Sequence, residues 1–127
     1  MKKIALLFSF LFLFGVCQTF AQQQMEKAIA IGAREYWTLQ IAPDKTETVN
    51  GRFQARGGSG NDVEVYILDE DGLENWKNGH STPTYYNSGR KTVGTFNVTL
   101  NKGVYYLVIS NTFSSVSSKA VTLKLWE

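Results

Sequence analysis

The side chains that most often carry out enzymatic chemistry are scarce in this chain of 127 residues. It contains one histidine, His80, and one cysteine, Cys17. A hydrolytic triad needs a nucleophile, a base and an acid in mutual contact, and no spacing in the sequence brings a serine or a carboxylate to His80. A zinc site needs several nitrogen or sulfur ligands, which these two residues cannot supply. The sequence therefore predicts a protein that is not an enzyme and that requires no cofactor.

Calcium is the metal whose preferred ligands the sequence does concentrate, because calcium binds oxygen. The candidate ligands are Asp62, Asp69, Asp71 and Glu74. The run that starts at Asp69 lacks the alternate spacing of an EF-hand loop. The alternative is a strand-ending turn in which aspartate side chains accept hydrogen bonds from backbone N–H groups. We expect the turn, and we assign no metal.

The segment Gly57-Gly58-Ser59-Gly60 has the glycine content of a phosphate-binding loop. A P-loop, however, ends in Lys followed by Ser or Thr and runs into a helix. Here Asn61 and Asp62 follow, the next residues alternate as in a strand, and the Asp62 carboxylate would repel phosphate. We therefore predict a hairpin loop.

Residues 71–90 form the longest segment without regular alternation, and they carry four candidate contact residues: Trp76, His80, Tyr85 and Tyr86. Loops on a rigid β scaffold often carry recognition, and aromatic side chains stack on sugar rings or anchor protein interfaces. Neighbours in a strand point to opposite faces, so one tyrosine of the pair is expected to face outward. The competing interpretation is that Leu73 and Trp76, three residues apart, cap one end of the core.

The first twenty-one residues have the three parts of a secretory signal peptide. Met1-Lys2-Lys3 is basic, Ile4–Cys17 is apolar except for Ser9, and Thr19-Phe20-Ala21 supplies small residues at the −3 and −1 positions before Gln22. We therefore expect cleavage before Gln22 and a secreted or periplasmic protein. The apolar stretch is too short for a membrane-spanning helix, so no membrane insertion is expected after cleavage. Lipidation of Cys17 is the alternative, although Val16 stands where lipoprotein signals place a small residue.

Removal of this segment also changes the charge. The chain has 13 basic and 11 acidic residues, and Lys2 and Lys3 account for the difference. A neutral domain gives no electrostatic reason to bind nucleic acid or an anionic membrane. The charges are nevertheless ordered, because residues 57–74 contain acids without bases and residues 75–126 contain bases without acids. Either this order produces a bipolar surface, or the two groups form separate solvated faces.

Apolar and polar residues alternate through most of the remaining chain, which is typical of half-buried strands. Asn50-Gly51 could form a tight hairpin turn, but we favour one strand in which Gly51 is a thin spot or a bulge. One helical turn is expected within Asp71–Asn78, a turn at Ser88-Gly89, and a hairpin turn at Asn101-Lys102-Gly103. The predicted strands cover residues 35–42, 46–56, 62–68, 84–87, 92–100, 104–110 and 119–126.

These strands and the absence of a long helix predict the all-β class, as an antiparallel β-sandwich of about seven to eight strands with a jelly-roll-like arrangement. Residues 22–34 are ambiguous, either an N-terminal leader or a short first strand. Residues 35–127 are expected to form the sandwich domain.

Two parts of the chain resemble GOLD domains, the Golgi-dynamics lumenal β-sandwiches of cargo-receptor proteins. Residues 57–67 look like the central strand of that family and the loop before it. Gly103-Val104-Tyr105-Tyr106, residues 110–114 and Lys119-Ala120-Val121 are similar to its C-terminal hairpin. The resemblance covers roughly residues 47–126 and implies a GOLD-like fold. Bacterial pre-peptidase C-terminal domains are similar through residues 62–66 and 103–108, and both families are non-catalytic sandwich modules.

The chain departs from the GOLD pattern in two respects. The family often has a disulfide, and Val108 stands where we would align one of its cysteines. The receptors continue into a coiled coil and a membrane helix, whereas this sequence stops at Glu127. The resemblance therefore implies the fold and not a cargo-receptor role.

Three functional hypotheses follow, in order of preference. The first is an exported, non-catalytic β-sandwich that binds a protein or a cell-envelope component. The second is a carbohydrate-binding module that uses exposed Tyr and Trp side chains. The third, a small hydrolase, ranks last because the sequence offers no catalytic constellation.

Overall fold

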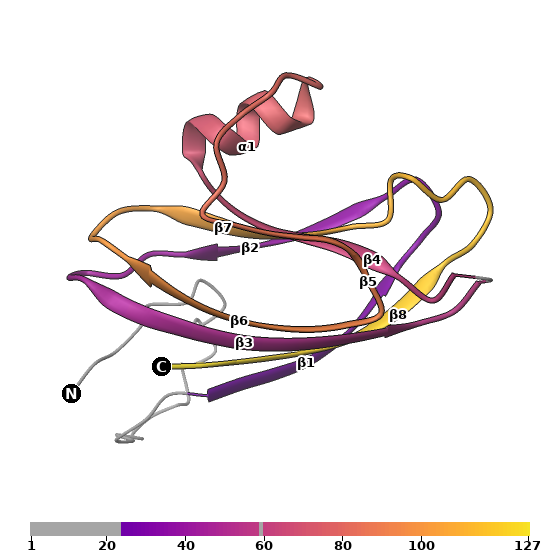
Figure 1. The fold of residues 1–127 in the computed structure, drawn as a ribbon, viewed down its shortest axis with the longest axis horizontal. Coiled ribbons are helices and arrows are strands. Elements are labelled where there is room, and N and C mark those ends of the chain that lie inside the picture. The colour runs from indigo at the N-terminus through magenta and orange to yellow at the C-terminus, as the bar shows by residue number, and fades with distance from the viewer. Residues whose placement is uncertain (1–23, 59) are drawn as a thin grey trace, which may run out of the picture.

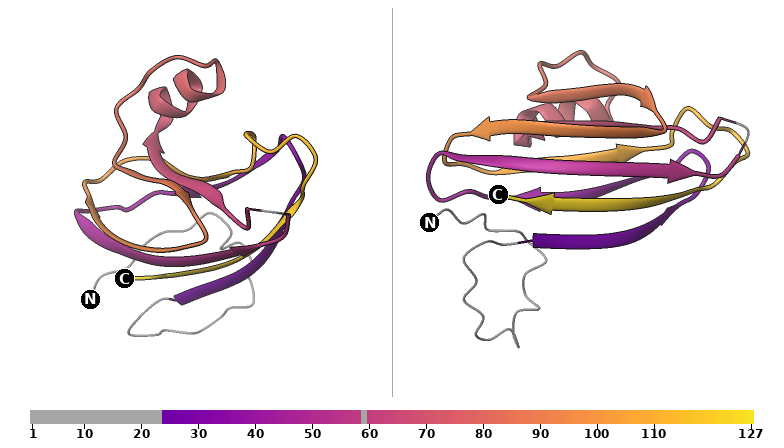
Figure 2. Two further views of the ribbon diagram at one scale, coloured as in Figure 1. Left: turned by 45° about the vertical axis from the view of Figure 1, so that its right-hand side comes forward. Right: turned by 60° about the horizontal axis from the view of Figure 1, so that its bottom comes forward.

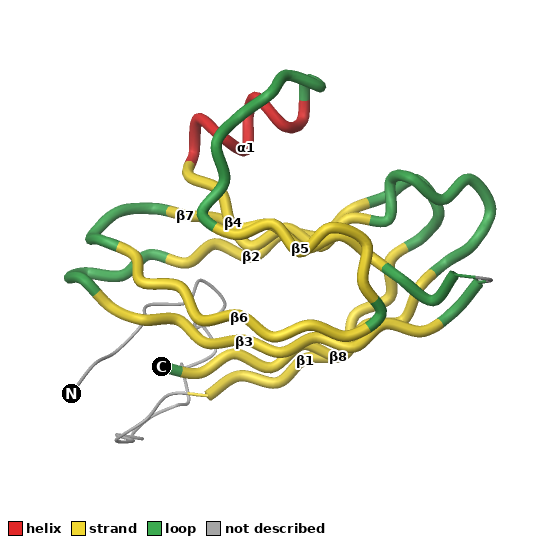
Figure 3. Tube along the Cα trace, in the orientation of Figure 1, coloured by secondary structure: helices red, strands yellow, loops and turns green. Residues whose placement is uncertain are grey.

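The computed structural model describes residues 24–58 and 60–127. The predicted signal peptide over residues 1–21, its cleavage before Gln22 and the lipidation alternative at Cys17 all lie outside the described residues. Within them the chain forms two stacked four-stranded antiparallel sheets with one short helix above the upper sheet (Figure 1). Loops gather at both ends of the stack (Figure 3). The predicted all-β sandwich is confirmed.

The strands are arranged as in a jelly roll, in which two sheets of four strands interleave along the chain. One sheet has the order β1-β8-β3-β6 and the other the order β2-β7-β4-β5. The helix α1, Glu70–Lys77, joins β4 to β5. The strands are β1 Gln24–Ile31, β2 Tyr36–Ile41, β3 Glu47–Arg56, β4 Val63–Asp69, β5 Tyr86–Lys91, β6 Val93–Leu100, β7 Tyr105–Ser110 and β8 Lys119–Trp126.

Apart from the β4–β5 connection, every link between consecutive strands crosses from one sheet to the other. Two predicted hairpins are therefore wrong, because the strands that they join belong to different sheets. They are the loop at residues 57–60 and the turn at residues 101–103. The described residues of both segments lie outside the strands, and each segment joins strands of different sheets. Alternation within a strand reports which face is buried and carries no information about which strand lies alongside.

The segment from β4 to β5 differs most from expectation. The strand predicted over 84–87 lies instead at Tyr86–Lys91, and the turn expected at Ser88-Gly89 is part of it. The register shifts between Glu64 and Tyr66, and there the Val65 N–H donates to Ser88 Oγ at 2.9 Å. Gly89 has a φ of +69°, which few residues other than glycine adopt. A local irregularity thus lets a turn-like sequence continue as a strand.

The helix is longer than the single turn predicted within residues 71–78. Asp69 caps it, because its Oδ1 accepts a 2.7 Å hydrogen bond from the Gly72 N–H. Glu70 and Asp71 lie in the first turn and Lys77 in the last, an order that complements the helix dipole. No helix in the described part of the chain combines the length and apolar character needed to cross a membrane.

Most of the interior between the sheets is apolar and is filled by the inward-facing residues of the strands. Two tight places in it involve glycine opposite phenylalanine on β3 and β6. Gly51 pairs with Phe96, and Phe53 pairs with Gly94. A Cβ placed on Gly51 would come within 2.1 Å of the Phe96 ring, and one on Gly94 within 2.5 Å of the Phe53 ring. Gly51 is thus a thin spot in one continuous strand, and each ring fills the space above the opposite glycine.

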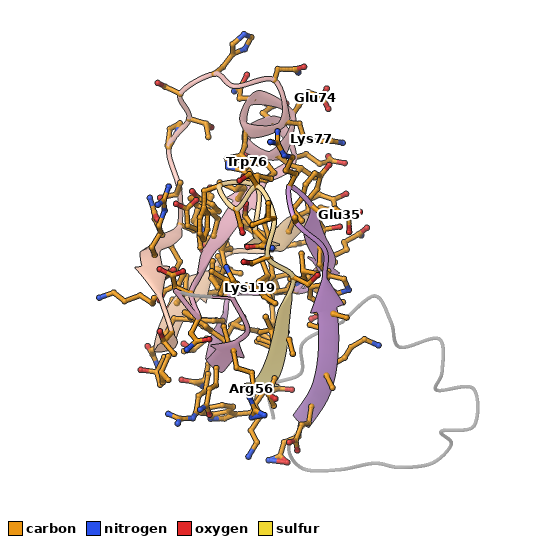
Figure 4. All side chains as sticks on the ribbon, turned by 90° about the vertical axis from the view of Figure 1, so that its right-hand side faces the viewer. Glu35, Arg56, Glu74, Trp76, Lys77 and Lys119 are labelled. Carbon is orange, nitrogen blue, oxygen red and sulfur yellow. The ribbon has the colours of Figure 1, made fainter. Side chains whose placement is uncertain are left out.

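A buried polar network closes the end of the sandwich where β3, β7 and β8 meet loops. The Lys119 side chain is 2% exposed, and its Nζ donates to Asn111 Oδ1 and to the Asp62 carbonyl, both at 2.8 Å. Asn111 Nδ2 in turn donates to the carbonyls of Gly32 and Ser117, at 3.0 and 2.8 Å. Figure 4 shows Lys119 in the interior, between Trp76 beneath α1 and Arg56 at the opposite face. These bonds connect three loops to the first residue of β8.

Replacing Gly51 by alanine should destabilise the protein by about 1–3 kcal/mol, because the added methyl group must displace a packed ring. Urea denaturation measures this loss. Gly32→Ala is the control, since its Cβ would meet only the flexible end of the Glu35 side chain. The double variant Gly51→Ala/Phe96→Ala should lose less stability than the sum of the single variants. Additive losses would contradict the packing described for this pair.

Replacing Lys119 by methionine should cost about 3–5 kcal/mol, because buried oxygens of Asn111 and Asp62 lose their charged donor. The matched control is Lys124→Met, on the same strand but exposed, which should change stability by less than about 0.5 kcal/mol. Equal midpoints for the two variants in chemical denaturation would show that the network contributes little to stability.

Candidate functional site

Trp76 belongs to α1, and its side chain lies between the helix and the outer surface of the β2-β7-β4-β5 sheet (Figure 4). Its ring meets Tyr36 edge-on, with centroids 5.0 Å apart, and Tyr66 in a tilted arrangement at 5.7 Å. Below them Leu68 and Val108 are buried. The indole therefore helps to attach the helix to the sheet, and it is only partly exposed.

Tyr66 continues this cluster into a row of polar contacts. Its hydroxyl donates to Glu64 Oε1 at 2.8 Å, and Glu64 Oε2 accepts from Arg90 Nε at 3.3 Å. The Arg90 guanidinium lies 4.1 Å above the Phe113 ring centroid. Burial, followed by the hydrogen bond to the Glu64 carboxylate, raises the pKa of Tyr66 to about 12. Each polar group thus has a partner, and the row has the character of a structural support.

The structure does not bring the four predicted contact residues together. Tyr86 packs against the core and lies 4.9 Å from the Phe96 ring. Tyr85 is 47% exposed and meets Tyr105 edge-on at 5.2 Å. His80 is exposed in the loop after α1. Of the adjacent residues Tyr85 and Tyr86, Tyr85 is therefore the tyrosine that faces outward. Contact of Trp76, His80, Tyr85 and Tyr86 with a partner stays a prediction.

The four calcium candidates are also separated by their roles. Asp69 is the N-cap of α1, and Asp71 is exposed in its first turn. Glu74 Oε2 accepts from Asn78 Nδ2 at 3.4 Å. Asp62 lies at the end of the sandwich that holds the buried Lys119 network, with its Oδ1 3.9 Å from Lys119 Nζ. No three potential metal ligands cluster among the described residues.

The fold brings part of the basic segment of the chain next to the acidic one. Arg90, on β5, lies beside the acidic strand β4 and pairs with Glu64. Lys119 is buried. Pairing of β5 with β4 places Arg90 among the acids, and the choice between a bipolar surface and two solvated faces stays a prediction.

The outer face of the β1-β8-β3-β6 sheet has a different character, and we call it the polar face. No described helix or loop packs across it, and Figure 2 (right) turns it toward the viewer. The outward residues of β3 and β8 supply amide, hydroxyl and cationic groups together with one indole. The polar face comprises Gln24, Glu26, Asn50, Arg52, Gln54, Thr95, Asn97, Thr122, Lys124 and Trp126.

Strand register arranges these side chains in rows that run across the sheet. The first row is Gln24, Trp126, Asn50 and Asn97, and the second is Glu26, Lys124, Arg52 and Thr95. In the first row Asn97 Nδ2 donates to Asn50 Oδ1 at 2.6 Å, and Asn50 Nδ2 points to the Trp126 carbonyl at 3.5 Å. This linked pair of amides orients polar groups beside the indole of Trp126.

Two shallow, open depressions of about 250 Å³ each mark this face. The first lies over the paired ends of β1 and β8, around Trp126, and the second lies over the middle of the sheet. The second is lined by Glu26, Arg52, Phe53, Gln54, Thr122 and Lys124. Both are open to a ligand that lies along the surface, and neither encloses one.

The polar face was not predicted as a site from the sequence, although alternation shows which residues of each strand are polar. Alternation placed Trp126 with Thr122 and Lys124 on the polar side of the last strand, and Asn50 and Arg52 on the polar side of another. These strands are about seventy residues apart in the chain. The sequence does not show that β8 pairs with β3, and so the rows are visible only in the fold.

No known protein family and no curated protein sequence matches the chain. The resemblance to GOLD domains and to pre-peptidase C-terminal domains therefore stays a prediction. Solved structures with a similar fold include the Yersinia pseudotuberculosis-derived mitogen, at 14% identity with a TM-score of 0.49, covering 81% of this chain and 84% of that one.

Two further solved structures match the chain at similarly low identity. The carbohydrate-binding module CBM36, solved with calcium and xylotriose, is 12% identical with a TM-score of 0.42 and covers 85% of this chain and 100% of its own. PliG of Aeromonas hydrophila, a periplasmic inhibitor of g-type lysozyme, is 10% identical with a TM-score of 0.39, covering 85% and 90%. No residue role passes to this chain at such identities.

Replacing Trp76 by alanine should cost about 1–3 kcal/mol of unfolding free energy, because two aromatic contacts worth about 0.5–1.5 kcal/mol each are lost. Urea denaturation measures it, with the neighbouring exposed residue as the control in Lys77→Ala, where a change below about 0.5 kcal/mol is expected. A loss for Trp76→Ala as small as that of the control would show that the indole does not hold α1 on the sheet.

Proposed function

We propose that the protein is an exported, non-catalytic carbohydrate-binding module whose ligand lies across the polar face. The observation that carries this proposal is the first row of that face, where the half-buried, outward Trp126 is the register partner of Asn50, whose amide is linked to that of Asn97. A sugar ring has apolar C–H faces and a rim of hydroxyls. An aromatic surface bordered by amides matches both, since the indole covers the C–H face and the amides donate to and accept from hydroxyls.

The rest of the polar face fits a polyhydroxylated ligand better than a protein partner. Protein interfaces have an apolar core from which charged residues are depleted. Here the centre of the face is occupied by Arg52, Gln54, Thr122 and Lys124, with Trp126 toward one end. Hydroxyl-rich ligands make use of such groups, whereas a protein would have to desolvate them without a hot-spot cluster around them.

The same face lacks the groups needed to cleave a glycoside. Glycosidases use two carboxyl groups on either side of the scissile bond. Among the strand residues of the polar face, Glu26 is the one carboxylate. Binding without hydrolysis is therefore the activity that these side chains support.

Affinity electrophoresis of residues 22–127 in gels containing soluble polysaccharides, together with a glycan array, tests the proposal. At least one glycan should retain the protein. Trp126→Ala should weaken that retention about tenfold or more, since ring stacking on an aromatic side chain, by analogy with nucleic-acid bases, is worth roughly 1–3 kcal/mol by alanine substitution.

The matched control is Tyr85→Ala, which removes an exposed aromatic side chain from the loop before β5. It should leave retention unchanged, and thermal unfolding should show that both variants are folded. Equal weakening by the two variants, or no retention of the unmodified protein by any glycan, would contradict the proposal.

A further inference from the structure

The second row of the polar face places two cations directly opposite each other. Arg52 on β3 and Lys124 on β8 are register partners. Side chains in such positions have Cβ atoms about 4.5–5.5 Å apart, and like charges there are destabilising. Neither forms a salt bridge with any carboxylate in the described residues.

One neighbour of this pair carries a negative charge, and it lies beside Lys124 and not beside Arg52. Glu26 is the register partner of Lys124 on the side away from Arg52, and Thr95 is the partner of Arg52 on its other side. Arg56, further along β3, adds another positive charge to the same side of the sheet and projects from it in Figure 4. Arg52, Arg56 and Lys124 against Glu26 leave this face with an excess of positive charge, and the rest of residues 22–127 is correspondingly negative.

Both cations also line the second depression, together with Gln54, Thr122 and Phe53, and with Glu26 at its β1 side. An arginine guanidinium offers paired N–H donors that match the two oxygens of a carboxylate, and a lysine ammonium adds a point charge. Gln54 and Thr122 provide donors and acceptors for adjacent hydroxyls. Charge, hydrogen-bonding groups and open space coincide at this position.

We propose that this depression is a subsite for the carboxylate of an acidic polysaccharide, so that the ligand of the polar face contains uronic acid residues. This inference rests on the proposed carbohydrate-binding function. The first and second rows lie two residues apart along β3, a separation of about 6.8 Å. That is comparable to one sugar residue in a chain, so one ring stacks on Trp126 while the next presents its carboxylate to Arg52 and Lys124.

The test compares two ligands that differ only in charge: polygalacturonate and the same polymer with its carboxylates methyl-esterified. Binding to each is measured by affinity electrophoresis and by isothermal titration calorimetry. The protein should bind polygalacturonate at least about tenfold more tightly than the ester. Raising the salt concentration to about 1 M, where the Debye length is about 3 Å, should remove most of that difference.

Two double variants with the same loss of charge isolate the subsite. Arg52→Gln/Lys124→Gln should reduce affinity for polygalacturonate about tenfold or more and leave affinity for the ester unchanged. Lys91→Gln/Lys102→Gln, which removes two exposed lysines away from the polar face, should change neither affinity. The first variant should unfold at the same or a higher temperature, because it relieves repulsion. That outcome excludes misfolding as the cause of lost binding.

These measurements distinguish failure of the acidic subsite from failure of the carbohydrate-binding function. If the acid and the ester bind equally and both depend on Trp126, the acidic subsite is wrong and the carbohydrate-binding function stands. If both double variants weaken polygalacturonate binding equally, attraction is diffuse and the subsite is again wrong. If no neutral or acidic polysaccharide is retained, the proposed function itself is overturned.

Discussion

The buried ammonium group of Lys119 is the interaction on which the arrangement of this sandwich most depends. Because nearly every connection crosses between sheets, one end of the stack must be closed by loops whose backbone groups need partners. Lys119 and Asn111 supply those partners for three loops at once. Since Lys119 is also the first residue of β8, the same bonds set where that strand begins between β1 and β3. The outward positions of Lys124 and Trp126 follow from that placement.

Alternation in the sequence was enough to predict most strands, and the last strand, residues 119–126, was predicted with the bounds that the structure has. It was not enough at β5, where Ser88-Gly89 has the composition of a turn yet lies within a strand because Ser88 Oγ replaces a backbone partner of Val65. Pairing could not be predicted in any case. Which strand lies beside which depends on contacts between distant residues, and those contacts leave no local pattern.

The same limit explains the choice of site residues. The sequence predicts contact residues within 71–90 because aromatic side chains are close together there, but Trp76 and Tyr86 largely pack against Tyr36, Tyr66 and the core. The polar face is assembled from β1, β3, β6 and β8, each contributing two or three outward residues of unremarkable type. Only register turns these into rows, one combining an indole with amides and the next opposing two cations.

The position of β8 between β1 and β3 also constrains how the chain reaches this structure. The sheet that bears the polar face is completed by the last strand in the sequence, which pairs with the first strand on one side and the third on the other. A chain emerging from a ribosome or a narrow channel would leave both of those strands with unpaired edges until residues 119–126 arrive. The sheet therefore assembles late, when β8 becomes available. Its contacts join residues that are distant in the sequence, and topologies of this kind fold slowly. During that interval the exposed edges are the segments most open to pairing with another chain.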